Sequence, residues 1–141
     1  MDDALVRLLE ERNRGVLATI RRDGRPQLSN VNYVYDDEVQ IIRVSITDDR
    51  AKARNLRRDP RAAFHVTTDD GWAYVVADAS AELTPVAQDP HDATVEELIE
   101  LFRAVQGEHS DWDDYRAAMV RDRRLVLRLH VDRVYGLPPR D

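Results

Sequence analysis

The sequence contains no cysteine, which excludes disulfide bonds, thiolate nucleophiles and cysteine-ligated metal centres. No apolar run approaches the ~20 residues of a membrane-spanning helix, and the acidic start Met1-Asp2-Asp3 lacks the basic and apolar regions of a signal peptide. We therefore expect a cytoplasmic protein without a membrane segment. Lysine is nearly absent too, because Lys52 is the only one beside 20 arginines. A compact ammonium and a planar guanidinium are not interchangeable, so Lys52 is a candidate functional residue.

Catalytic motifs are also missing. The four histidines, at positions 65, 91, 109 and 130, are scattered and show no metal-ligand spacing, so we expect no metal site. The serines lie in no nucleophile elbow, and no glycine-rich nucleotide motif is present. The net charge of −6 argues against general nucleic-acid binding, which needs a broad basic surface. If the protein is an enzyme, we expect a bound cofactor to supply its chemistry.

Residue patterns predict one domain over residues 1–141, mainly β with appended helices. Six strands are predicted at 15–20, 26–35, 39–46, 62–67, 72–83 and 125–134. A first helix covers 2–13 with Asp2 or Asp3 as its cap, and a short basic helix is capped by Asp48 or Asp49 and ends at Pro60. A helical insert spans about 92–122, and Ser110 is the expected cap of its second helix. In the last strand Leu125, Leu127, Leu129 and Val131 are expected to face inward. Because hairpins join most of the strands, the pattern favours an antiparallel barrel or sandwich over a doubly wound sheet.

The basic helix is the first candidate site. Six cations lie at positions 50, 52, 54, 57, 58 and 61 of an acidic chain. A strand that leads into a helix N-terminus offers free N–H groups and a favourable dipole to a phosphate. A solvated basic face is the alternative, and this stretch alone does not separate the two.

Two further segments are polar. Gln27, Ser29 and Asn30 lie inside a predicted strand, where they cost β-propensity, so we expect them to contact something polar. The insert is crowded with acidic residues but lacks the spacing of a calcium loop. We interpret it as a solvated helical face.

Several motifs together resemble one family. They are Gly15-Val16-Leu17-Ala18-Thr19, Asp23-Gly24-Arg25-Pro26-Gln27-Leu28-Ser29-Asn30, Arg50-Ala51-Lys52-Ala53-Arg54-Asn55-Leu56, Asp69-Asp70-Gly71-Trp72 and Tyr135-Gly136-Leu137-Pro138. In this order they resemble the pyridoxamine-phosphate-oxidase-like split β-barrel proteins, specifically the actinobacterial branch that binds the deazaflavin coenzyme F420. The resemblance covers about Gly15 to Pro139.

The resemblance implies a split β-barrel homodimer with two cofactor sites at the subunit interface. It implies an F420H2-dependent reductase that transfers hydride to a small unsaturated acceptor. An FMN-dependent oxidoreductase and a non-catalytic F420 carrier are the alternatives. The chain lacks the C-terminal basic motif that binds the substrate phosphate in pyridoxamine phosphate oxidation, so that activity is not expected.

The resemblance also implies roles for individual residues. Arg50 and Lys52 would bind the cofactor phosphate, with Asn55 nearby. The deazaflavin would be lined by Gln27, Ser29, Asn30 and the backbone of Val44, Ser45 and Ile46. Trp72 and Tyr74 would shape the rest of the pocket, from the partner subunit. The alternative is that these two residues only pack in the barrel or at the interface. Arg54, Arg57 and Arg58 would meet either the acidic insert or the polyglutamate tail of F420.

Overall fold

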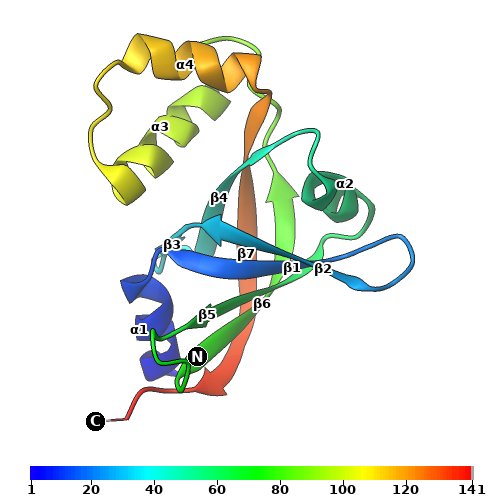
Figure 1. Ribbon diagram of the computed structural model, residues 1–141, viewed down its shortest axis with the longest axis vertical. Coiled ribbons are helices and arrows are strands. Elements are labelled where there is room, and N and C mark those ends of the chain that lie inside the picture. The colour runs from blue at the N-terminus through cyan, green and yellow to red at the C-terminus, as the bar shows by residue number, and fades with distance from the viewer. Residues whose placement is uncertain (141) are drawn as a thin grey trace.

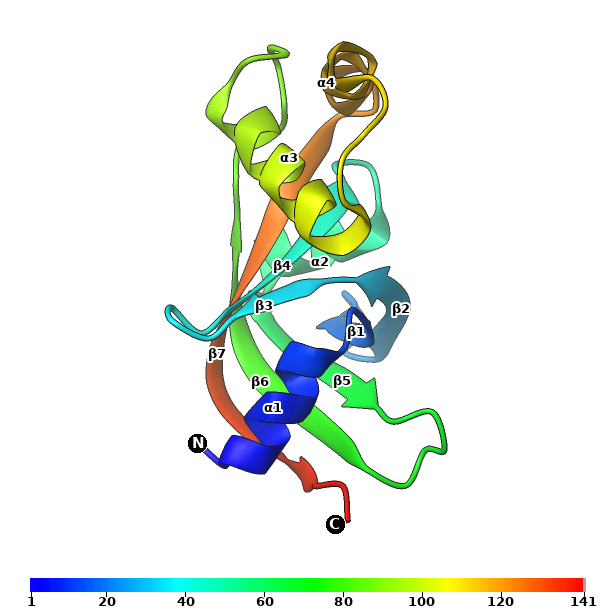
Figure 2. The same ribbon diagram turned by 90° about the vertical axis from the view of Figure 1, so that its left-hand side faces the viewer.

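The computed structural model describes residues 1–140 as a seven-stranded antiparallel sheet that curls into a half-barrel, with four helices (Figures 1 and 2). The strands are β1 (Arg14–Ile20), β2 (Pro26–Asn32), β3 (Val34–Asp36), β4 (Ile41–Thr47), β5 (Arg61–Thr67), β6 (Tyr74–Leu83) and β7 (Arg124–Leu137). The helices are α1 (Asp3–Glu11), α2 (Ala51–Arg58), α3 (Ala93–Gln106) and α4 (Trp112–Arg121). The strand order is β2-β1-β5-β6-β7-β4-β3. The predicted split β-barrel is confirmed.

The prediction of one continuous strand over 26–35 was wrong, because the chain changes sheet edge at Tyr33. β2 pairs only with β1 and β3 only with β4, so these consecutive strands form the two opposite edges of the sheet. Tyr33 is fully buried at the corner, its hydroxyl donates to the Leu9 carbonyl oxygen at 2.6 Å, and its ring meets Phe64 edge-on. This corner draws the two edges together and curls the sheet.

The barrel core fills the concave side of the sheet. Helix α1 is capped by Asp2, as predicted, and inserts Leu5, Leu8 and Leu9 among inward residues of β5, β6 and β7. The alternating residues of the last strand, 125, 127, 129 and 131, are all buried there, which confirms their predicted orientation. Gly15 is required by packing, since a Cβ at this position would lie 2.5 Å from the Phe64 ring.

The helical insert, which consists of α3 and α4, packs around a second core. This insert core contains Ala87, Val95, Leu98, Ile99, Tyr115, Met119 and Val126. Of these only Val126 comes from a strand, and it points away from its neighbours Leu125 and Leu127 in the barrel core. Figure 1 shows the two helices above the barrel, joined to it by the start of β7 and the segment after β6. The insert is therefore a satellite of the barrel.

Two predicted helix caps were wrong. The N-cap of α2 is Arg50, which makes no side-chain cap hydrogen bond, instead of Asp48 or Asp49. Asp48 pairs with Arg57 at 2.6 Å and Arg123 at 2.8 Å, so its carboxylate is turned away from the helix end. The N-cap of α4 is Asp111 instead of Ser110. No helix within residues 1–140 is long and apolar enough to cross a membrane.

Candidate functional site

A cleft of about 580 Å³ lies between the barrel and the helical insert. One wall comes from the barrel and from the N-terminus of α2, and it is polar. Its residues are Asn30, Asn32, Ser45, Thr47, Arg50, Lys52 and Arg124. The opposite wall comes from the insert and is mostly apolar. Its residues are Leu98, Leu101, Phe102, Val105, Tyr115 and Met119. A cleft of this size, in which apolar side chains face convergent polar groups, can hold a small molecule.

Three cations converge at the polar end of the cleft. Arg50, Lys52 and Arg124 all line it, and none of them forms an ion pair with a carboxylate of residues 1–140. Burial of the Lys52 ammonium lowers its pKa, and the neighbouring charges of Arg50 and Arg124 lower it further. Like charges held together without a counter-ion destabilise one another, so this end of the cleft favours an anion.

Two buried polar atoms in the same cleft have no hydrogen-bond partner in the described chain. They are the Thr47 hydroxyl oxygen and Nε of Arg124. Arg124 is otherwise held by β4, because its Nη1 lies 3.3 Å from the Ser45 hydroxyl. The register places Thr47 opposite Arg124 across β4 and β7. Buried polar groups are normally paired, so this end of the cleft has two unsatisfied polar atoms beneath its surface.

The backbone adds donors to this end of the cleft. Helix α2 begins at the cleft, and its N-cap Arg50 leaves the N–H groups of the first turn without a side-chain acceptor. These groups and the helix dipole favour a phosphate. β3 pairs only with residues 41 to 43 of β4. In the part of the chain that the structure describes, β4 residues from 44 to 47 therefore have β7 as their single strand partner. Their other edge is available to a ligand.

The structure places the predicted site residues in three groups. Arg50, Lys52, Asn30, Ser45 and Ile46 line the cleft together. The side chain of Val44 is buried in the barrel core, so only its backbone could contact a ligand. Ser29 is half-buried on β2 and faces the same way as Gln27.

Gln27 and Asn55 lie at a second cleft of about 750 Å³ on the other side of α2. Asn55 is buried, and its Nδ2 donates to Gln27 at 2.7 Å and to Thr19 at 3.1 Å. Its Oδ1 accepts from Arg58. Asn55 therefore fastens α2 to β1 and β2. The remaining lining is strongly basic and comprises Arg21, Arg22, Arg54, Arg57 and Arg58 with Asp23.

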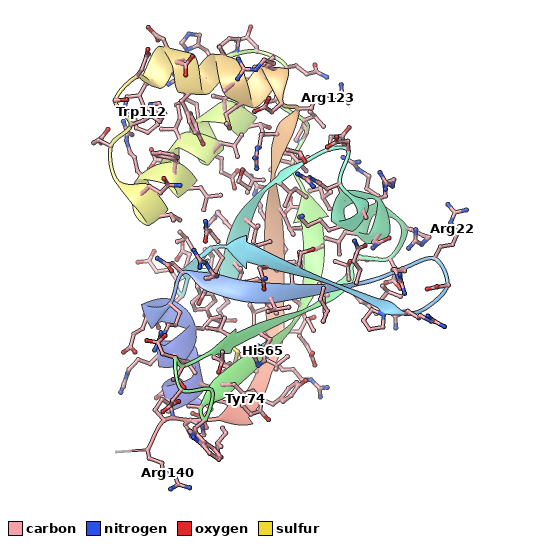
Figure 3. The ribbon with its side chains drawn as sticks, viewed as in Figure 1. Arg22, His65, Tyr74, Trp112, Arg123 and Arg140 are labelled. Carbon is pink, nitrogen blue, oxygen red and sulfur yellow. The ribbon has the colours of Figure 1, made fainter. Side chains whose placement is uncertain are left out.

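Trp72 and Tyr74 lie far from the cleft of their own chain. Figure 3 shows Tyr74 with His65 at the end of the barrel opposite the insert, where Trp112 is found. Trp72 is 78% exposed, and Tyr74 stacks on His65 at a centroid distance of 5.7 Å. A role for either residue in a cofactor pocket requires a second subunit.

Sequence reasoning missed the apolar wall and Arg124. The insert helices were interpreted as a solvated face, although the stripe of Leu98, Leu101 and Phe102 along α3 was visible. No local pattern marks Arg124, because only its pairing with Thr47 brings it to the cleft. Within residues 1–140 no group of three histidine or carboxylate side chains is arranged to hold a metal ion.

Solved structures share this fold at low sequence identity. A protein named F420 reductase matches with a TM-score of 0.74 and 24% identity, over 96% of this chain and 98% of its own. The heme storage protein HutZ of Vibrio cholerae matches with a TM-score of 0.69 and 19% identity, over 94% and 91%. An FAD-binding protein of Mesorhizobium loti matches with a TM-score of 0.64 and 22% identity, over 93% and 87%.

A family model agrees with the fold. The model described as pyridoxamine 5'-phosphate oxidase matches residues 1–137, which is nearly the whole chain. The half-barrel, its strand order and this match lead to the same assignment. The chain belongs to the pyridoxamine 5'-phosphate oxidase family.

Proposed function

We propose that the cleft binds the deazaflavin coenzyme F420 and that the protein is an F420H2-dependent reductase. The observation that carries the proposal is the set of three unpaired cations, Arg50, Lys52 and Arg124, facing an apolar helical wall. A phosphorylated cofactor with a large planar ring needs this combination. The similarity in fold to a protein named F420 reductase and to an FAD-binding protein supports a flavin-type cofactor.

The residues of the cleft fit such a cofactor. The phosphate would accept from Lys52, from the guanidinium of Arg50 and from the free N–H groups at the start of α2. Arg124 would add its positive charge to this end of the cleft. The exposed edge of β4 and Asn30 would meet the polar rim of the ring, and the insert would cover its apolar face.

The bound reduced deazaflavin would supply the hydride for the reaction. The residues of this chain would bind the cofactor, orient it and exclude water. Among residues 1–140 the cleft lining includes no histidine and no carboxylate, and the Tyr115 hydroxyl already donates to the Leu98 carbonyl oxygen. This lining is the observation that favours the second candidate, a non-catalytic F420 carrier.

The second cleft offers a place for the polyglutamate tail of F420. Helix α2 separates the two clefts, with Arg50 and Lys52 on one side and Arg54, Arg57 and Arg58 on the other. Within the described chain none of these three arginines pairs with the acidic insert. A polyglutamate tail that extends from the first cleft could therefore bind to the five arginine side chains that line the second cleft.

The second subunit of the proposed homodimer would cover the convex face of the sheet. On this face the register aligns Asn30, Val16, His65, Val76 and Tyr135 across five strands. Leu28, Tyr135 and Leu137 point from it into solvent and are 66%, 50% and 51% exposed. An exposed apolar sheet face of this kind marks an interface. Tyr74 lies beside Leu137 on the same face, where it could reach the partner's cleft.

Titration of the purified apo-protein with F420 and, separately, with FMN tests the proposal, with ligand fluorescence as the readout. We expect F420 to bind more tightly than FMN, because the second cleft also favours the polyanionic tail. Tighter binding of FMN would contradict the proposal and favour an FMN-dependent oxidoreductase of the same fold. If F420 binds but the reduced form is not oxidised by any of a broad set of acceptors, the result favours a non-catalytic F420 carrier.

Sedimentation of wild type and Leu28→Asp tests the proposed homodimer, because this substitution should dissociate the two subunits.

A further inference from the structure

The helical insert shares only part of its apolar core with the barrel. Its core is separate from the barrel core and shares with the sheet only Val126 of β7. The cleft lies in the gap between the two cores. The insert forms one wall of the cleft but has no continuous apolar contact with the opposite wall. Its position must therefore be fixed by another interaction.

Glu97 of α3 provides this contact. Its Oε2 accepts from Arg43 Nε of β4 at 3.2 Å and from Arg128 Nε of β7 at 2.9 Å. Arg128 Nη2 also contacts its Oε1. The carboxylate is only 19% exposed, and α3 carries no other acidic residue that pairs with a strand of residues 1–140. Glu97 joins the insert to two neighbouring strands at one point.

The strand side of this contact is itself fixed. Arg43 and Arg128 lie opposite each other in the β4–β7 register. Arg128 also pairs with Glu82 of β6 at 3.1 Å, and Arg43 lies 3.6 Å from Asp36 of β3. Four strands therefore hold the two guanidinium groups, while α3 contributes a single carboxylate. Removing that carboxylate removes the ionic contact of α3 with the sheet and leaves the strands paired.

We propose that Glu97 is a positioning residue for the cofactor cleft, and that its contacts with Arg43 and Arg128 set the distance between the apolar wall and the cationic end. Leu98 follows Glu97 directly, and Leu101 lies one helical turn further on the same side of α3. Both line the cleft. A shift of α3 at Glu97 therefore moves the surface that would cover the cofactor ring, but leaves Arg50 and Lys52 in place. The inference rests on the proposed function for the ring and on the ion pairs alone for the attachment.

Hydrogen exchange of the apo-protein tests the attachment without any cofactor. In Glu97→Gln, we expect amides of α3 to exchange about tenfold faster, as for a loss of about 1.4 kcal/mol of local stability, while amides of β5 keep their wild-type rates. The matched control is Glu100→Gln, since Glu100 lies on the same helix and pairs only with Arg103 within it. Arg43→Gln should produce a smaller effect, because Glu97 keeps both contacts with Arg128, and the double variant should exceed Glu97→Gln by little.

Binding measurements test the positioning. Glu97→Gln should weaken F420 binding about tenfold and leave the affinity for inorganic phosphate within about twofold of wild type, because the phosphate contacts only the cationic end. Unchanged exchange in α3, or an equal loss of F420 and phosphate binding, would overturn the proposal. If wild type fails to bind F420, the proposed function falls, and the exchange rates of α3 still decide whether Glu97 holds the insert.

Discussion

The barrel and the helical insert are stabilised in different ways. The barrel core is continuous from α1 through five strands, and its largest side chains, Tyr33 and Phe64, pack edge to face at 4.8 Å. The insert core is smaller, and among residues 1–140 its acidic face turns toward the barrel only at Glu97. The barrel is thus a rigid frame, whereas the insert is a helical hairpin fastened to it at its base and by one ionic contact.

This difference explains the chemistry of the cleft. The rigid frame supplies the charged groups, which must be held in place because like charges repel. The insert supplies apolar side chains, for which exact placement matters less than coverage. It also carries the excess negative charge of the chain, with ten acidic residues and four arginines between 85 and 123. The basic anion site therefore lies on the barrel, and most of the excess acidic residues lie on the helical insert.

Phe64→Ala should have the largest effect on stability. Phe64 is fully buried against Tyr33 in the barrel core, and deletion of a buried aromatic ring costs about 3–5 kcal/mol. Because the barrel core is continuous, we expect one cooperative transition at a lower midpoint in chemical denaturation, with the insert lost together with the barrel. Persistence of the barrel signal at wild-type denaturant concentrations would show that the core is not one unit.

Leu98→Ala should destabilise the insert by about 2–5 kcal/mol and leave the barrel folded. Leu98 is fully buried in the insert core. Circular dichroism should lose helix in a first step, while the fluorescence of Tyr33 and its neighbours reports the barrel in a second. Val39→Ala is a suitable control, because this valine is half exposed and should change stability by less than about 0.5 kcal/mol. A single transition for Leu98→Ala would remove the distinction between the two regions.

Acid should release the insert before the barrel unfolds, with a smaller effect than either substitution. Hydrogen bonds from Arg128, and to a lesser degree its charge and that of Arg43, lower the pKa of Glu97 below its ordinary 4.5. The stabilisation is therefore fully present above about pH 4.5 and is lost as the pH falls through the lower pKa of the folded state. Hydrogen exchange measured between pH 5 and pH 3 should show α3 opening in wild type. In Glu97→Gln the opening of α3 should depend less on pH, and the remaining dependence comes from Asp92 and Glu96, whose pKa values are also lowered by their hydrogen bonds.

The half-barrel could be predicted because its signals are local. Alternating residues mark most of the strands, and the turn Asp23-Gly24 marks the first hairpin. The division at Tyr33 could not be predicted, because β2 and β3 read as one alternating run and separate only when the sheet curls. The cap at Arg50 was missed for a related reason. Asp48 is the better cap by residue type, but its carboxylate forms ion pairs with Arg57 and Arg123 instead.

The site residues that belong to one continuous segment were predicted. The site residues that come together only through the pairing or packing of two distant segments were missed. Arg50 and Lys52 belong to one strand-to-helix junction and do line the cleft. Arg124 reaches them only through the pairing of β4 with β7, and Glu97 reaches the strands only through the docking of α3. Asn55 was expected beside the phosphate, but a buried amide on the inner side of α2 finds Gln27 and Thr19 first. Its role at the cofactor stays a prediction.

The anion site at Lys52 is tested most directly by F420 titrations of three proteins: wild type, Lys52→Ala and the control Arg7→Ala. Arg7 lies exposed on α1, away from both clefts. Loss of a charge-assisted contact with the phosphate should cost Lys52→Ala about 1.5–3 kcal/mol of binding free energy, which is roughly a 10- to 150-fold weaker affinity, while Arg7→Ala stays within about twofold of wild type. Wild-type affinity in Lys52→Ala would contradict the proposal that this cleft holds the phosphate of the cofactor.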